Sequence, residues 1–533
     1  MRLPAALEPL RSPVYRGLWF AWLAANMTMW MNDVSAAWLM TTLTTSPVMV
    51  ALVQTASTLP VLLLAVPSGA MADIVDRRLY FAATQLWVSA TALVLAALSL
   101  AGALTAPVLL VLTFLNGIGL AMRLPVFSAI VPQVVPRTQL PTALALSGIS
   151  MNLSRVIGPV LAGALIAAAS PALVFVLNAL LSVLAFVLIL RWRSTPRTSP
   201  LPGERFIGAM RVGLNFAWQS PRLKGVMWRS FLFFLQSAAL TSLLPLVARG
   251  LHGGGPGTFT MLLSCLGLGA ILAALLAPRW RQRWSRDDFV RGGTLAYALM
   301  AGLIVTAQEI WLAVPAMVVV GMAWLLVANS LSVAAQSVLP DWVRARGMAI
   351  YQMSLMGGAA CGGLVWGQVA GRAGVDAAVL GSSALGIGVW LLTRGRHVDA
   401  GPELDYSPAP AAPRPEPAIP VEPEEGPVMV TLEYLIDPAR ADEFAAVMRR
   451  TRGARLRQGA LSWGLFRDTA DPGRYVEYFV DENWLEHQRR LERFTTFDAE
   501  LRAQRLAFHL GAEPPTMQRY VADQRVERPT PPV

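Results

Sequence analysis

Residues 60–88 have the sequence PVLLLAVPSGAMADIVDRRLYFAATQLWV, in which two apolar runs flank a short turn with two aspartates and two arginines. An apolar helix of about 20 residues is long enough to cross the hydrocarbon core of a membrane. This stretch therefore predicts two membrane-spanning helices joined by a charged turn outside the lipid. The same alternation of apolar runs and short loops continues along most of the chain.

The composition of the whole chain favours a membrane protein. Of its 533 residues, 55% are hydrophobic and only 14% are charged, which is too apolar for an ordinary soluble protein of this size. The two cysteines, Cys265 and Cys361, lie in apolar stretches with no second ligand at metal-binding spacing. We therefore expect no disulfide framework, no metal site and no cofactor, and the sequence contains no ATP-binding loop.

Apolar segments of spanning length recur between about residues 16 and 393. They predict an all-α polytopic membrane protein with about twelve transmembrane helices. The expected bounds are 16–43, 47–70, 79–103, 106–131, 141–168, 171–191, 226–249, 257–279, 289–307, 310–338, 347–371 and 375–393.

Positive charge collects in alternate loops, as it does on the cytoplasmic side of membrane proteins. This pattern accounts for the net charge of +11 and argues against nucleic acid as the partner of a basic surface. Arg249 and Arg372 are exceptions, because they fall in the other set of loops. We expect a bacterial inner-membrane protein with both termini in the cytoplasm. The basic connections carry Arg77 and Arg78; Arg137; Arg191, Arg193, Arg197, Arg205 and Arg211; Arg279, Arg281, Arg283 and Arg286; and Arg344 and Arg346.

The two halves of the apolar region resemble one another. AIVPQVVPRTQLPTALAL before the fifth segment is similar to QSVLPDWVRARGMAIYQ before the eleventh, with Pro132 and Pro340 in matching places. This similarity predicts a parallel repeat of two six-helix halves. The expected organisation is a first transmembrane half at 1–195, a cytoplasmic central loop at 196–225 and a second transmembrane half at 226–396.

The composition changes after the last apolar segment. Residues 397–426 are rich in proline and acidic residues, which is typical of an extended linker. Residues 427–522 then show strand-like alternation in MVTLEYLI, ALSWGLF, RYVEYFV and MQRYV, with helical patterns after the first and third of these. The order β-α-β-β-α-β predicts an α+β ferredoxin-like domain, followed by a short tail at 523–533.

Two short motifs resemble those of the major facilitator superfamily. GAMADIVDRR matches its signature loop, which in that family latches the outward-open state, and NLSRVIGPVLAG matches the antiporter motif of its exporters. A glycine lets two helices approach closely, and a proline inside a helix permits a bend. The matching residues are Gly69, Asp73, Asp76, Arg77 and Arg78 in the signature loop, and Gly158, Pro159 and Gly163 in the antiporter-like motif.

Nearly the whole chain resembles the transmembrane secretion effector branch of this superfamily, which is related to bacterial siderophore exporters. WMNDVSAAWLMTTLT, GLAMRLPVFSAIVPQVVP and GALSWGLFRD carry the resemblance, and the C-terminal part is similar to antibiotic-biosynthesis monooxygenase-like domains. The chain departs from the family in its fourth helix, where Thr113 stands in place of the usual arginine before Asn116. Arg123 lies further along, so a proton-relay role does not transfer to it directly.

Ionisable residues inside the apolar segments are the candidates for coupling. A charge at the bilayer centre costs about 3 kcal/mol, so such groups usually face a cavity or a partner. Asp33 is the candidate for a carboxylate that binds and releases a proton, and Arg155 and Arg123 are candidates for its cation or for binding an anionic substrate. Arg123 is equally well explained by helix packing. The expected cavity-lining residues are Trp30, Met31, Asn116, Asn152, Asn329 and Gln352.

These observations predict a proton antiporter that exports small siderophore- or drug-like molecules through rocking of the two halves. Import by the same fold remains an alternative, because the fold works in both directions. A second alternative is an active C-terminal monooxygenase with His487 as the base, although the sequence shows no catalytic partner for it. We expect instead that this domain is an accessory module that forms homodimers.

Overall fold

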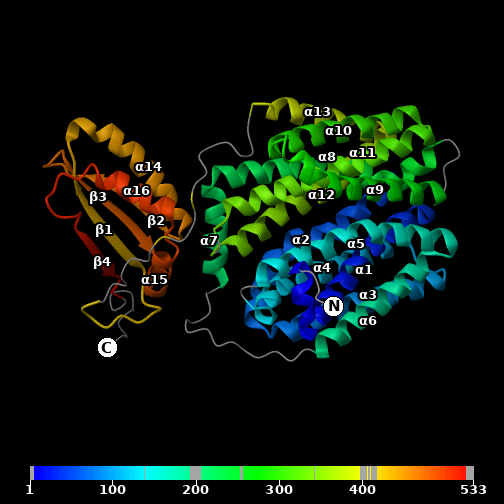
Figure 1. Cartoon of the computed structure of the whole chain (residues 1–533), viewed down its shortest axis with the longest axis horizontal. Helices are drawn as coiled ribbons and strands as arrows, with labels where there is room; N and C mark the ends of the chain where they lie inside the picture. Colours follow the sequence, from blue (N-terminus) through cyan, green and yellow to red (C-terminus); the bar gives the residue numbers. More distant parts are fainter. Residues whose placement is uncertain are drawn as a thin grey trace, which may run out of the picture. The chain divides into compact units, whose positions relative to one another are not determined.

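The computed structural model describes residues 5–136, 139–191, 206–251, 256–340, 342–395 and 417–523, together with residues 405 and 409. The chain forms two compact units (Figure 1). One unit holds nearly all of the long helices, and the other contains the β-sheet. The first consists of Met1–Gly203, Val226–Ala334 and Tyr351–Asp399, and the second of Glu204–Gly225, Ala335–Ile350 and Ala400–Val533.

Eleven helices in the described residues, α2–α6 and α8–α13, are long and apolar enough to cross a membrane. Helix α1 is longer still at 31 residues but carries Arg16, Asn26, Asn32 and Asp33. With α1, the predicted set of about twelve is complete. The bounds are α1 Pro13–Leu43, α2 Pro47–Ile74, α3 Arg77–Leu100, α4 Ala106–Val134, α5 Leu140–Ala168, α6 Pro171–Arg191, α8 Pro221–Gly250, α9 Pro256–Trp280, α10 Arg286–Ala307, α11 Ile310–Val338, α12 Arg344–Ala373 and α13 Val375–Thr393.

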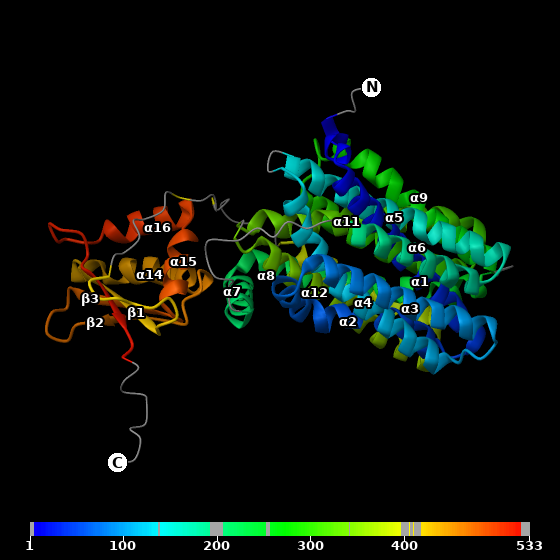
Figure 2. The ribbon, with the colours of Figure 1, turned by 90° about the horizontal axis from the view of Figure 1, so that it is seen from below.

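The long helices form two groups in chain order. Helices α1–α6, blue to cyan in Figure 1, pack among themselves, with α1 between α5 and α6 and with α2 on α4. The green helices α8–α13 form the second group. Figure 2 shows α1 running alongside α5 and α6, and α9 beside α5. These two groups confirm the expected division into two six-helix halves, and the α5–α9 contact joins them.

The proposed match between Pro132 and Pro340 is wrong. Pro132 lies within α4, whereas α4 ends two residues before Pro136 and α11 ends two residues before Pro340. In the first half α5 begins four residues after Pro136, and in the second half α12 begins four residues after Pro340. Pro136 is therefore the structural equivalent of Pro340. A proline lacks the N–H that continues a helix and disfavours helical backbone before it, which explains why both helices end just ahead of it.

The predicted central loop at 196–225 contains a helix, α7, at Phe206–Gln219. Its Val212 and Phe216 are buried and lie four residues apart, on one face of the helix. Helix α8 then begins at Pro221, earlier than the predicted start at residue 226. The hydropathy pattern missed α7 because a single short amphipathic helix has too few apolar residues to span a membrane. Residues 192–205 of the loop lie outside the described part of the chain.

The C-terminal domain has the expected strand and helix order, and its four strands form an antiparallel sheet in the order β2-β3-β1-β4. The second helical segment is divided into α15 and α16, because Thr495 forms a capping box with Asp498 and starts a new helix. The bounds are β1 Val428–Leu435, α14 Ala441–Arg457, β2 Ser462–Arg467, β3 Arg474–Asp481, α15 Trp484–Glu492, α16 Thr496–Leu506 and β4 Met517–Val521.

One face of this sheet forms the core of the domain. Alternate β1 residues, such as Val430 and Tyr434, pack with Phe444 of α14 and Trp484 of α15. Because side chains alternate along a strand, the residues between them lie on the opposite face. Phe466, which is 62% exposed, stacks there on Tyr478 with ring centroids 5.5 Å apart. This second face, which we call the open sheet face, also carries Met429, Val476, Val480 and Tyr520.

A buried carboxylate stabilises the core of the domain. Glu477 is fully buried and accepts hydrogen bonds from Arg455 Nε at 3.0 Å, Trp463 Nε1 at 3.1 Å and Tyr434 Oη at 3.0 Å. Burial alone would raise the pKa of Glu477. The guanidiniums of Arg455 and Arg505 and the hydrogen bonds outweigh burial and lower this pKa to about 2.

A fragment of residues 417–533 should therefore lose stability in acid. The folded-state pKa of Glu477 lies below its ordinary value of 4.5, so the unfolded chain binds the proton more readily and the stabilisation disappears as the pH falls from about 5 to 2. Glu477→Gln should cost about 3 kcal/mol at pH 7 and weaken this pH dependence, as measured by urea unfolding. Glu433→Gln removes an exposed partner of Arg474 and should cost under about 1 kcal/mol. Equal losses in the two variants would contradict the assignment.

Candidate transport site

Arg155 of α5 lies between the two halves. Its guanidinium carbon is 5.5 Å from the ring centroid of Trp30 in α1 and 4.6 Å from that of Trp324 in α11. Tyr351 of α12 is close enough to interact with it electrostatically. Within the described part of the chain, Arg155 forms no ion pair, and its buried Nε has no hydrogen-bond partner. The arrangement offers a cation between two aromatic rings, which suits an organic anion with an apolar body.

Asp33 lies one helical turn after Trp30 on the same side of α1. It is partly exposed, and no described residue forms a hydrogen bond or ion pair with it. Its neighbour Asn32 is buried and accepts a hydrogen bond from Asn178 of α6 at 3.3 Å. The two adjacent polar residues therefore differ in role: Asn32 joins α1 to α6, while the Asp33 carboxylate remains available.

The predicted cavity-lining residues do not all lie together. Trp30 belongs to the Arg155 cluster, and Gln352 follows Tyr351 with a buried Oε1 that has no partner in the described residues. Asn116 is buried and donates to Thr91 of α3 at 3.4 Å, so its amide contributes to helix packing. Asn329 is exposed on α11. The side chain of Asn152 lies outside the described residues.

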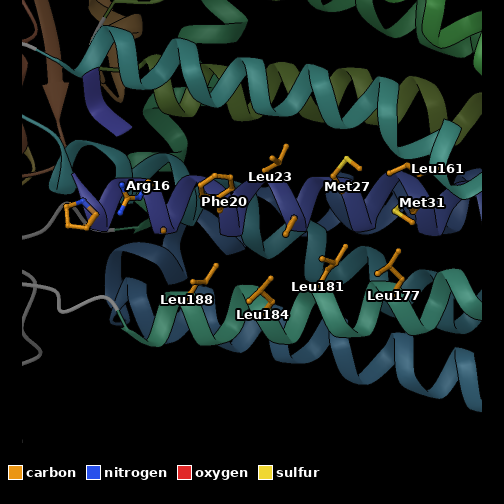
Figure 3. Close-up of a pocket in the computed structure, with 13 residues that line it drawn as sticks. Arg16, Phe20, Leu23, Met27, Met31, Leu161, Leu177, Leu181, Leu184 and Leu188 are labelled. Carbon is orange, nitrogen blue, oxygen red and sulfur yellow. The ribbon is translucent and has the colours of Figure 1, made fainter. Parts of the chain in front are cut away.

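Met31 instead lines a separate apolar groove along α1. This groove has a volume of about 650 Å³ and is lined by residues of α1, α5 and α6. Figure 3 shows Phe20, Leu23 and Met27 along α1 and the leucines of α6 on the neighbouring helix, with Arg16 at one end. Among the described lining residues, Arg16 alone is charged, so the groove suits hydrocarbon better than a polar ligand.

Arg123 of α4 has both terminal nitrogens hydrogen-bonded to α1, while its buried Nε has no hydrogen-bond partner in the described residues. It is 2% exposed, hydrogen-bonds the carbonyl oxygen of Ala25, and contacts Asn26 Oδ1 at 3.3 Å. Its guanidinium carbon also lies 5.5 Å from the ring centroid of Trp22. These contacts favour the packing role over a role in coupling.

The signature loop is built around the start of α3. Asp76 caps this helix by accepting from the backbone N–H groups of Arg78 at 2.8 Å and Leu79 at 3.2 Å. Arg78 donates to the carbonyl oxygen of Leu190 near the end of α6, where carbonyls lack intrahelical partners. Arg77 begins α3. Gly69 and Asp73 both lie within α2, and the side chain of Asp73 is outside the described part of the structure.

The antiporter-like motif brings α5 close to two other helices. A Cβ on Gly158 would lie 2.8 Å from Trp30 Cβ in α1, and a Cβ on Gly163 would lie 2.7 Å from Thr260 Cγ2 in α9. Thr260 also donates to the carbonyl oxygen of Gly163 at 3.1 Å. Pro159 is buried between these contacts. Gly163 therefore lies where α5 of the first half contacts α9 of the second half. Arg155 lies earlier on the same helix.

In the C-terminal domain, His487 has a carboxylate partner that the sequence did not reveal. His487 is 1% exposed, and its Nδ1 lies 2.7 Å from Asp481 Oδ2. Its Nε2 accepts a hydrogen bond from Arg519 Nε at 3.2 Å, so both ring nitrogens are occupied. Burial, together with Arg490 and Arg519, outweighs the carboxylate and lowers the pKa of His487. The imidazole is therefore neutral at pH 7, with its proton on Nδ1.

Sequence reasoning missed Trp324, Tyr351 and Asp481. Trp324 and Tyr351 lie more than 150 residues after Arg155 in the chain, and tryptophans and tyrosines are common at packing positions throughout transmembrane helices. Asp481 ends β3 six residues before His487. The alternation of β3 places Glu477, Phe479 and Asp481 on one face, which was the available signal for a buried carboxylate.

The two groups of long apolar helices, with Arg155 between them, define a multi-pass helical protein of the kind that spans a membrane. Comparison with protein families is consistent with this class: the model described as transmembrane secretion effector matches residues 4–528. The chain belongs to that family.

Two relatives are transporters. The chain is 24% identical over 254 residues to the staphyloferrin A transporter of Staphylococcus aureus, an alignment that covers 47% of this chain and 63% of the relative. It is 26% identical over 262 residues to an uncharacterised major facilitator-type transporter of Bacillus subtilis, covering 48% and 61%. The chain thus aligns with less than two thirds of either relative.

Solved structures with this fold are also similar. The nucleoside transporter NupG, as a D323A mutant, matches with a TM-score of 0.59 at 14% identity, covering 72% of this chain and 99% of that one. An inward-facing bacterial homologue of the human lysosomal transporter Spinster matches with a TM-score of 0.56 at 15% identity, covering 72% and 97%. These similarities show the fold.

Gly163→Val should impair transport strongly. The added methyl groups would meet Thr260 and push α5 away from α9, so we expect the transport rate to fall by about tenfold or more. Gly148→Val is the matched control on the same helix, because a Cβ there meets nothing within 4 Å. Uptake or efflux in vesicles, normalised to the amount of folded protein, measures both. Equal rates for the two variants would contradict a role for the α5–α9 contact.

Proposed function

We propose that this protein exports small organic molecules from the cytoplasm by proton antiport, with the two halves rocking about the Arg155 cluster. The substrates are siderophore- or drug-like compounds that carry an acidic group. The observation that supports this best is Arg155, which lies between Trp30 and Trp324 and has no carboxylate partner in the described residues. An anionic substrate would supply that partner, and the rings would cover its apolar body.

The proposed coupling residue is Asp33. Asp33 follows Trp30 by one turn of α1, and Trp30 contacts Arg155, so Asp33 lies on the side of α1 that carries the Arg155 cluster. In an antiporter, substrate and proton compete: the deprotonated Asp33 carboxylate accepts a hydrogen bond from a hydroxyl or ammonium group of the substrate while Arg155 binds its acidic group, and protonation of Asp33 weakens the first contact. Each ligand thus lowers the affinity for the other, so substrate and proton bind in exchange.

We place the protein in a bacterial inner membrane, with both termini on the cytoplasmic side. The basic loops support this orientation, because they follow α2, α4, α6, α9 and α11 and therefore lie on one side. The C-terminal ends of α1 and α8 then lie on the outer side of the membrane. Export is supported by the antiporter-like glycines of α5, and a siderophore-like substrate by the staphyloferrin A transporter among the relatives. If the protein were instead an importer, net substrate movement across the vesicle membrane would run in the opposite direction.

The C-terminal domain is proposed to be a non-catalytic accessory module that forms homodimers through its open sheet face. Both ring nitrogens of His487 are engaged, and the imidazole is buried, so it is poorly placed to accept a proton from a substrate. The open sheet face combines the stacked rings of Phe466 and Tyr478 with Met429 and Tyr520, which is the composition of an interface centre.

Asp33→Asn should abolish the response to a proton gradient. In inverted membrane vesicles, we expect substrate accumulation driven by an imposed pH gradient to fall by about tenfold or more, because the amide cannot bind and release a proton. Substrate exchange without a gradient should persist. The probe is a siderophore or fluorescent drug that accumulates in cells lacking the protein.

Asp376→Asn is the matched control for this measurement, since Asp376 is an acidic residue at the start of α13 and hydrogen-bonds Gln308 at an exposed site. Its gradient response should stay within about twofold of the unmodified protein. Full transport by Asp33→Asn with an unchanged pH dependence would rule out Asp33 as the coupling group.

Phe466→Glu should dissociate the proposed dimer of the fragment 417–533. A charge at the centre of an apolar interface leaves an unpaired buried carboxylate, which we expect to weaken dimerisation by about tenfold or more. Leu510→Glu is the control, because Leu510 is 70% exposed and belongs to the segment between α16 and β4, not to a strand of the open sheet face. Analytical ultracentrifugation measures both, and a monomeric unmodified fragment would refute the dimer.

A further inference from the structure

Arg249, one of the two arginines that depart from the alternating charge pattern, binds the end of another helix. Its Nη1 donates to the carbonyl oxygen of Thr41 at 2.8 Å, and its guanidinium carbon lies 5.1 Å from the ring centroid of Trp38. Arg249 belongs to α8 in the second half, whereas both partners belong to the last two turns of α1 in the first half. Each contact therefore crosses from one half to the other.

The carbonyl of Thr41 is one of the last four of α1, which have no N–H partner within the helix. A guanidinium at that position satisfies the carbonyl and is favoured by the negative end of the helix dipole. Trp38 is buried and stacks on Phe259 of α9, with ring centroids 5.1 Å apart and planes inclined by 21°. The end of α1 is thus held by residues of both α8 and α9.

A row of glycines closes the same end of the bundle on another side. Gly363, Gly367 and Gly371 of α12 lie four residues apart, on the face that meets the beginning of α2. A Cβ on each would lie 2.6 Å from Thr55 Oγ1, 2.7 Å from Ala51 Cβ and 2.7 Å from Val48 Cγ2, respectively. At Gly363 and Gly367 the backbone of α2 is also near and a side chain would clash, whereas at Gly371 only the Val48 side chain is met, so the two halves are in contact here.

We propose that Arg249 is a latch that holds this end of the transporter closed, and that it releases α1 in each transport cycle. The proposal rests on the proposed function, in which this end faces outward and must open to discharge substrate. Arg249 is exposed, so on release its charge passes into water rather than remaining buried. A contact with a small release cost is what a reversible latch requires, in contrast to the fully buried Arg123.

Disulfide formation between Val48→Cys and Gly371→Cys measures closure at this end directly. A Cβ on Gly371 would lie 2.7 Å from Val48 Cγ2, so the two introduced thiols are within disulfide reach when the halves are together. Cys265 and Cys361 are first replaced by alanine. The oxidation rate of the purified full-length protein is followed by electrophoresis without reductant.

Arg249→Gln should slow this oxidation by about tenfold, because the open state becomes more populated. Arg372→Gln is the matched control at the same end, since Arg372 is exposed in the last turn of α12, and its rate should change by less than about twofold. Trp38→Leu keeps Arg249 but removes its ring partner, and it should also slow oxidation. Monodisperse elution of each variant in detergent verifies folding.

An oxidation rate in Arg249→Gln and Trp38→Leu equal to that of the parent pair would overturn the latch. The assay needs no substrate and no proton gradient, so its outcome is independent of the transport proposal. Slower oxidation with no export of any probe would retain the latch and refute the exporter. Normal export with unchanged oxidation would retain the exporter and refute the latch.

Discussion

Close backbone approach at glycine positions joins the two six-helix halves, and the transport site depends on it. In lipid, apolar surface gains little from burial between helices, so association relies on packing and interhelical hydrogen bonds. Gly163 allows α5 to touch Thr260 of α9, and the α12 glycines allow contact with α2. Arg155 is placed between rings of the two halves because the backbones that carry them lie so close.

Two arginines within this scaffold show how partners decide function. Arg123 has the carbonyl of Ala25, the amide of Asn26 and the ring of Trp22, and it joins α4 to α1. Arg155 has rings on two sides but no carboxylate within the described residues. A charge whose two terminal nitrogens are hydrogen-bonded, as those of Arg123 are, has a large cost of release, whereas a charge with only aromatic partners gains from binding an anion. The same residue type thus contributes to helix packing at Arg123, while at Arg155 it has the surroundings that the proposed recognition of an anion requires.

Much of the fold was predictable from the sequence because hydrocarbon thickness fixes helix length. The bounds of α6, α11 and α13 were predicted to the residue, since proline, glycine or a polar loop marks their ends. The rotational position of each helix was not predictable. Trp30 and Met31 are neighbours in sequence, yet Trp30 contacts Arg155 and Met31 lines the apolar groove. Helices that are apolar on all sides give no periodic signal for which face meets which neighbour.

The C-terminal domain follows different physics, because it folds by burying apolar side chains against one face of a sheet. Its interior nevertheless holds Glu477 and Asp481, each paired with an arginine, on the same strand as Phe479. The Asp481–His487 pair has the geometry that orients a catalytic base in enzymes. Here Arg519 of β4 occupies the remaining ring nitrogen, so the pair connects β3, α15 and β4 and its hydrogen-bonding capacity is used within the fold.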